Sequence, residues 1–172
     1  MNIFVLDSDV EKAARWHVDR HVVKMPLETA QMLCTARHEL GGTPEHIPYK
    51  VAHKNHPCTV WARQSRANYQ WLCDLGIALC EEYTHRYEKV HKCQAVIQDC
   101  IDNPPEFTNT EITEFPQAMD EEYKMDDPIM AYRKYYNKGK APKYILELSR
   151  EETEKVKDLI QKAIDRLKKD DE

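Results

Sequence analysis

The chain has 172 residues and a formal net charge of −5, a length that predicts one ordinary hydrophobic core and no second domain. It contains only four glycines, whereas Glu, Lys, Ala and Leu are plentiful, so the composition favours helix. The acidic balance argues against wholesale nucleic-acid binding but leaves room for a local basic groove.

No run of about 18 apolar residues occurs, and the first residues lack the basic start of a signal peptide. We therefore expect a cytoplasmic protein with no membrane partner. The six cysteines include no C-x-x-C pair and are interpreted as buried free thiols of a reduced compartment. No Gly-rich phosphate loop or dinucleotide fingerprint is present, so no cofactor is predicted.

The first part of the chain predicts a short strand and one long helix. Residues 2–6 are largely apolar and are followed by Ser8 and Asp9, either of which suits a helix N-cap. The helix would run to about residue 40 and stop at a Gly-Gly pair. Pro26 lies inside it, and we expect a kink there rather than a break, because the apolar stripe keeps its phase on both sides.

The remainder of the chain predicts loops and further helices. A loop over 43–57 precedes a long central helix that starts at Pro57, and a shorter helix covers about 89–101. An acidic irregular loop at about 102–127 leads to a helix near 127–136. A capping box at Ser149 opens an amphipathic helix over about 149–170, whose apolar stripe would dock on the core or pair with a second copy as a homodimer. The predicted fold is an all-α, compact single-domain helical bundle over 1–172, with a short N-terminal extended segment.

The leading candidate site is a polar stripe on the first helix. His17, His21, Lys24 and Glu28 are spaced by 4, 3 and 4 residues, which on one continuous helix places them within an arc of roughly 80°. A parallel apolar stripe would set them at the edge of the core, where burial and close charges shift pKa values most. The alternative is a solvated helix face whose histidines are incidental.

Two further patterns carry weaker chemistry. His53 and His56 are candidate metal ligands, although their spacing matches no tight metal signature, so no metal is predicted. The stretch from Tyr132 to Tyr136 alternates aromatic and basic residues, as stacking on bases beside phosphates requires, but a core-facing tyrosine helix would show the same pattern. The candidate nucleic-acid-binding residues are Arg37, Arg63, Arg66, Tyr132, Arg133, Lys134 and Lys138.

These motifs resemble the phage-type pyrimidine-dimer DNA glycosylases, also called endonuclease V. The first helix of that family carries Asp-x-His, a Glu seven residues after the His and an Arg nine residues beyond, as Asp19, His21, Glu28 and Arg37 do here. His56, Arg86 and the Tyr132–Tyr136 stretch extend the likeness over roughly 14–140. The chain departs from the family at Leu27 and Gln31, where the family places DNA-binding arginines.

The resemblance implies an enzyme that acts on the bond between a nucleobase and deoxyribose, with DNA as its partner. In the family, the α-amine exposed by removal of Met forms a Schiff base with the sugar while the helix Glu assists. Here Asn2 is too large for routine Met removal, and more residues precede the helix than in the family. Two candidate nucleophiles follow: the terminal amine, if it reaches Glu28, and the side-chain amine of Lys24. The other function classes are a nucleotide-level enzyme of the same fold and a non-catalytic or metal-binding accessory protein.

Overall fold

The computed structural model describes residues 1–142, and in that part it is helical, with no strand. The chain divides into two compact units, Met1–Tyr135 and Tyr136–Glu172, and the first holds helices α1 to α6. The predicted all-α class is confirmed for the described residues. The predicted helix over 149–170 lies outside them, so the single domain over 1–172 and the pairing through that helix stay predictions.

The single first helix that the sequence predicts is two helices, α1 (Val10–Arg15) and α2 (Asp19–Glu39). Asp9 caps α1, since its carboxylate accepts from the backbone N–H groups of Glu11 and Lys12 at 3.0 and 3.1 Å. The break falls at residues 16–18, not at Pro26, which lies inside a continuous α2. His17 therefore precedes α2 and does not belong to its face.

Arg86 explains where that break occurs. Its guanidinium donates to the backbone carbonyls of Arg15 and His17 at 3.1 and 2.9 Å, and to the Asp19 carboxylate at 2.8 Å. Carbonyls at the end of a helix lack intrahelical partners, and a cation that binds them stabilises the ending. The side chain that fixes this break is thus far from it in sequence.

The predicted central helix is also divided, into α3 (Pro57–Ala62) and α4 (Arg66–Tyr87). Ser65 adopts an extended backbone and its hydroxyl accepts from the Asn68 N–H at 3.1 Å, so it caps a new helix. The side chain of Asn68 donates to the carbonyl of Trp61 in the last turn of α3 at 2.9 Å. Local side-chain hydrogen bonds thereby replace the helical ones across 63–65.

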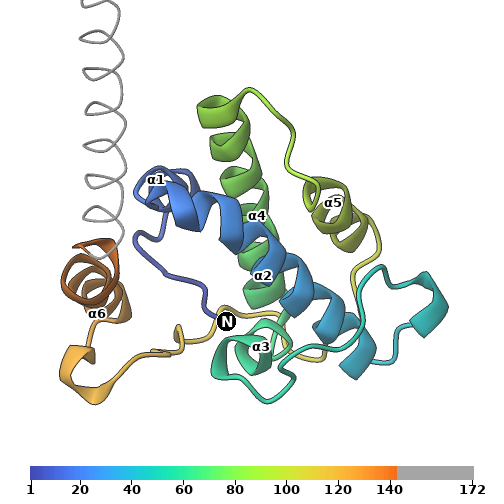
Figure 1. The fold of residues 1–172 in the computed structure, drawn as a ribbon. Coiled ribbons are helices and arrows are strands. Elements are labelled where there is room, and N and C mark those ends of the chain that lie inside the picture. Colours follow the sequence, from blue (N-terminus) through green and yellow to red (C-terminus); the bar gives the residue numbers. More distant parts are fainter. Residues whose placement is uncertain (143–172) are drawn as a thin grey trace, which may run out of the picture. The chain divides into compact units, whose positions relative to one another are not determined.

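Helix α4 is the centre of the first unit and contacts α1, α2, α3 and α5 (Gln94–Asp102) (Figure 1). Gly76 permits the close approach, because a Cβ at this position would lie 2.7 Å from a Thr29 methyl of α2 and 3.0 Å from Ile97 of α5. The acidic loop that follows contains one 3-10 turn, η2 (Glu121–Tyr123), and ends at α6 (Pro128–Tyr135). In the second unit, a π-helical turn, η3, covers Tyr136–Lys140.

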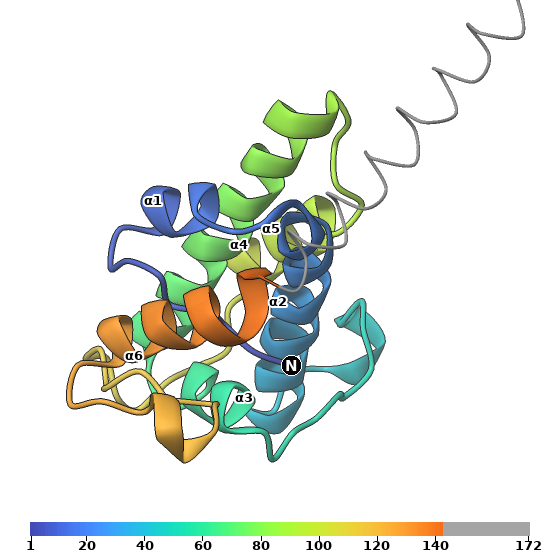
Figure 2. The same ribbon diagram turned by 60° about the vertical axis from the view of Figure 1, so that its left-hand side comes forward.

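Residues 2–6 do not form the predicted strand; the described structure leaves them in neither helix nor strand. Their side chains are nonetheless buried, with Ile3, Phe4, Val5 and Leu6 at most 5% exposed. This N-terminal segment, which we define as residues 1–7, passes between α6 on one side and α2 and α4 on the other (Figures 1 and 2). It is a core element, although it has no regular backbone structure.

The six cysteines are free and buried, as the sequence predicts. Among the residues that the structure describes, no helix is long and apolar enough to cross a membrane.

Candidate active site

Glu28, on the buried face of α2, receives the beginning of the chain. Its Oε2 accepts a hydrogen bond from the backbone nitrogen of Asn2 at 2.9 Å and lies 3.5 Å from the α-amine of Met1. The Glu28 side chain is 10% exposed, and that of Met1 is 2% exposed. The longer segment before the helix therefore does not keep the terminal amine from Glu28, because residues 1–7 fold back into the core and bring it there.

Lys24 approaches the same carboxylate from the other side. One turn before Glu28 on α2, its Nζ lies 2.9 Å from Oε1, while its side chain stays 60% exposed. The two oxygens of Glu28 thus face two amines, one at the start of the chain and one on α2. Glu28 is the point at which both candidate nucleophiles converge.

Asn2 anchors the N-terminal segment beside Glu28. Its side-chain amide donates to the carbonyl of Ala118 at 2.9 Å, and its Oδ1 accepts from the backbone N–H groups of Ile3 and Phe4 at 2.8 and 3.3 Å. From the sequence alone, Asn2 is only an obstacle to Met removal. Its partner Ala118 is 116 residues away in the chain, so no local pattern indicates this anchoring role.

The two histidines of the predicted stripe lie against the same segment. The His21 ring stacks on Phe4 with 4.6 Å between centroids, and the rings of His17 and His21 are 6.3 Å apart. Phe4 itself has a φ of 37°, a backbone conformation that is costly for an aromatic residue. The stripe is therefore organised around the N-terminal segment: the histidines meet Phe4, and Glu28 meets Asn2.

His17 is neutral at ordinary pH. Burial lowers its pKa from 6.5 to about 4, against the opposing effect of its hydrogen bond to the carbonyl of Ala13. A neutral, buried imidazole supports packing and can accept a proton only at low pH.

His56 and Cys58 border the site from α3. His56 caps this helix through Nδ1, which accepts from the backbone N–H of Cys58 at 3.2 Å. Burial lowers the pKa of His56, and the charged N-terminal amine lowers it further, whereas Glu28 raises it. Burial raises the pKa of Cys58 to about 12, so this thiol stays protonated and is unsuited to nucleophilic attack.

The metal-ligand candidates do not converge. His53 is exposed and His56 is committed to its helix cap. Within residues 1–142, no group of three or more His, Cys, Asp or Glu side chains is placed to hold a metal ion.

Two of the candidate DNA-binding arginines make contacts within the protein. Arg37 is buried, and its Nη1 donates to the Asp99 carboxylate at 2.5 Å. Arg63 donates to the carbonyl of Lys54 at 2.6 Å. A phosphate contact by Arg37 would require its ion pair to break.

The other candidates differ in exposure. Arg66, at the start of α4, is exposed, and so is Lys138 in the second unit. Lys134 donates to the carbonyl of Glu122 at 2.5 Å. The ring of Tyr132 is fully buried and its hydroxyl donates to the carbonyl of Pro116 at 2.7 Å, so stacking on a base is not available to it in this conformation.

Comparison with known proteins bears on the beginning of the chain. A family model described as pyrimidine dimer DNA glycosylase matches residues 1–95. The chain belongs to the pyrimidine dimer DNA glycosylase family. Comparison with curated proteins and with solved structures gives no match.

The part of the chain that matches this glycosylase family holds Glu28, its partners Met1, Asn2 and Lys24, and the bordering His56. This match includes the N-terminus, which lies outside the resemblance inferred from the sequence over roughly 14–140. It ends before α6, so the stretch from Tyr132 to Tyr136 lies outside it.

Proposed function

We propose that this protein is a DNA glycosylase that removes a damaged pyrimidine through an amine at the start of the chain, with Glu28 as its partner. The observation that carries the proposal is the position of Glu28 Oε2, 3.5 Å from the Met1 amine and 2.9 Å from the Asn2 nitrogen. Either nitrogen would serve as the amine, according to whether the chain begins at Met1 or at Asn2.

The chemistry follows from this pairing. An unprotonated amine attacks the anomeric carbon of the deoxyribose, a C–N bond forms, and the bond from that carbon to the base breaks with its electron pair leaving on the base. The departing base takes up a proton from water. The bond from the same carbon to the ring oxygen then breaks, the nitrogen loses a proton and the ring oxygen gains one, which leaves a Schiff base on the opened sugar. The Glu28 carboxylate can carry that proton from the nitrogen to the ring oxygen and stabilise positive charge that develops on the sugar.

The α-amine is favoured over Lys24 as the nucleophile because the Met1 side chain is buried beside Glu28, whereas the Lys24 side chain is 60% exposed. Lys24 then has the role of an exposed cation beside the carboxylate, where a DNA phosphate would arrive.

The test is base release from a duplex that contains one pyrimidine dimer. Glu28→Gln keeps the volume of the side chain and removes its charge, so we expect a rate at least on the order of 100-fold lower. Glu39→Gln, on the same helix with the same loss of charge, serves as the control and should act as wild type does. A wild-type protein that leaves the dimer intact, or a Glu28→Gln variant as fast as wild type, would refute the proposal.

A further inference from the structure

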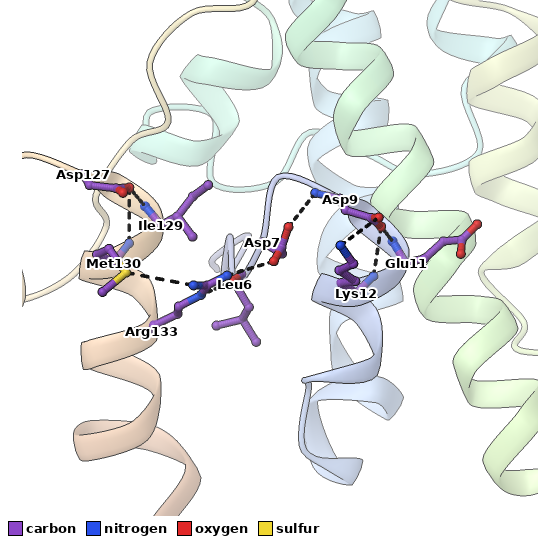
Figure 3. Close-up of polar contacts among 9 residues, drawn as sticks. All are labelled: Leu6, Asp7, Asp9, Glu11, Lys12, Asp127, Ile129, Met130 and Arg133. Atoms are coloured by element: carbon purple, nitrogen blue, oxygen red, sulfur yellow. Dashed lines mark hydrogen bonds and ion pairs between the residues drawn. The ribbon is translucent and has the colours of Figure 1, made fainter.

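Arg133 of α6 is committed to the N-terminal segment. Its Nε donates to the carbonyl of Leu6 at 2.6 Å, and its Nη2 donates to the Asp7 carboxylate at 2.8 Å. The guanidinium also lies over the Trp16 ring, 4.7 Å from the centroid. Figure 3 shows the side chain reaching from α6 to Leu6 and Asp7. The planar fork of an arginine suits such a two-point contact, and a lysine would not reproduce it.

The other end of the same segment carries the proposed nucleophile. Asn2 and the Met1 amine lie at Glu28. Leu6 is four residues after Asn2, and an extended chain of that length spans at most roughly 14 Å. The buried segment between them has no helix or strand to fix its position. Side chains hold it instead: Glu28 and Asn2 near the amine, and Arg133 at the far end.

Asp7 extends the connection to α1. Its carboxylate also accepts from the backbone N–H of Asp9 at 3.0 Å, just before α1 begins (Figure 3). This hydrogen bond is the main cause that lowers the pKa of Asp7, and Arg133 lowers it further. Arg133 therefore ties α6, the end of the segment and the start of α1 together.

We propose that Arg133 is a positioning residue, which holds the N-terminal segment in the place that keeps the α-amine at Glu28. This inference rests on the proposed function for its catalytic meaning. The sequence pattern predicts instead that Arg133 contacts DNA. The two roles differ in what they change: a positioning residue sets the rate of the chemical step, whereas a phosphate contact sets affinity and its salt dependence.

The experiment measures borohydride trapping of the full-length protein on a duplex with one abasic site, at saturating and at limiting DNA. For Arg133→Gln we expect the saturating rate to fall at least roughly tenfold, since a displacement of about 1 Å can cost on the order of 100-fold, with the dissociation constant unchanged. Arg133→Lys should recover little of the rate. Arg15→Gln, which removes an exposed arginine that pairs with Glu11, is the control for charge. Weaker binding with an unchanged saturating rate, or no change at all, would overturn the positioning role.

Asp7→Asn keeps the experiment informative if Arg133→Gln does not fold. It retains an oxygen for the Asp9 N–H and loses the ion pair, so we expect the same defect in smaller degree. An Asp7→Asn variant with the wild-type saturating rate would then count against the inference.

A second measurement does not depend on glycosylase activity. Acetylation of the α-amine by acetic anhydride, followed by mass spectrometry of the N-terminal peptide, measures how accessible the amine is to the reagent. An amine that stays in place at Glu28 reacts more slowly than one that is displaced. We expect Arg133→Gln to react several-fold faster than wild type and Arg15→Gln to react at the wild-type rate. A wild type that is never trapped on DNA would refute the proposed function, while equal acetylation rates would refute the positioning role.

Discussion

His17 gives the folded state a pH dependence at the scale of one residue. Because burial lowers its pKa from 6.5 to about 4, the unfolded chain binds a proton in that window and the folded protein does not. Its contribution to stability is complete above pH 6.5 and is lost as the pH falls toward 4, by on the order of 3 kcal/mol. Urea unfolding at a series of pH values should show this loss, and in His17→Asn the free energy of unfolding should depend less on pH. An unchanged pH slope in the variant would contradict this origin.

Individual contacts show which parts of the candidate site can be predicted from the sequence and which cannot. The 4-residue spacing of Lys24 and Glu28 predicts their contact, because it is set by one helix turn. The contact of Glu28 with Asn2 has no such local rule, since the two residues are 26 positions apart in the sequence and the chain reverses its direction between them. Arg133 appeared as a surface cation for the same reason: its partners, Leu6 and Asp7, are more than 100 residues away.

At the scale of elements, the helical periodicity indicates which segments are helices but not where they are interrupted. The apolar stripe runs through 14–36 without a change of phase, yet the chain breaks at 16–18 because Arg86 binds the carbonyls there. Pro26, the expected weak point, lies inside α2. The break between α3 and α4 depends on Ser65 and Asn68, whose capping chemistry could have been recognised locally.

Gly76 provides a test of how closely α4 packs on its neighbours. Gly76→Ala would gain roughly 1 kcal/mol of helix propensity, but its Cβ would stand 2.7 Å from a methyl of Thr29 in a buried contact. Overpacking of this kind costs roughly 1–3 kcal/mol, so we expect a net loss in the free energy of unfolding. Thr29→Ser in the same chain removes that methyl and should restore part of the loss. Denaturant unfolding that finds Gly76→Ala more stable than wild type would contradict the close approach.

At the scale of the molecule, an acidic protein must offer DNA a restricted basic surface. The net charge is −5, and of the candidate arginines, Arg66 is exposed whereas Arg37 is buried against Asp99. We expect Arg66→Gln to weaken duplex binding and to lower the slope of log affinity against log salt by about 1. Arg37→Gln should instead reduce stability. Fluorescence anisotropy at several salt concentrations distinguishes them, and an unchanged slope for Arg66→Gln would remove this residue from the interface.

The proposed mechanism requires a Schiff base formed by the amine that the fold brings to Glu28. Borohydride reduction during reaction with abasic-site DNA, followed by peptide mapping, tests this directly. We expect a covalent complex whose cross-link maps to the N-terminal peptide, and trapping that persists in Lys24→Ala. Absence of any covalent complex, or a cross-link at Lys24, would contradict it.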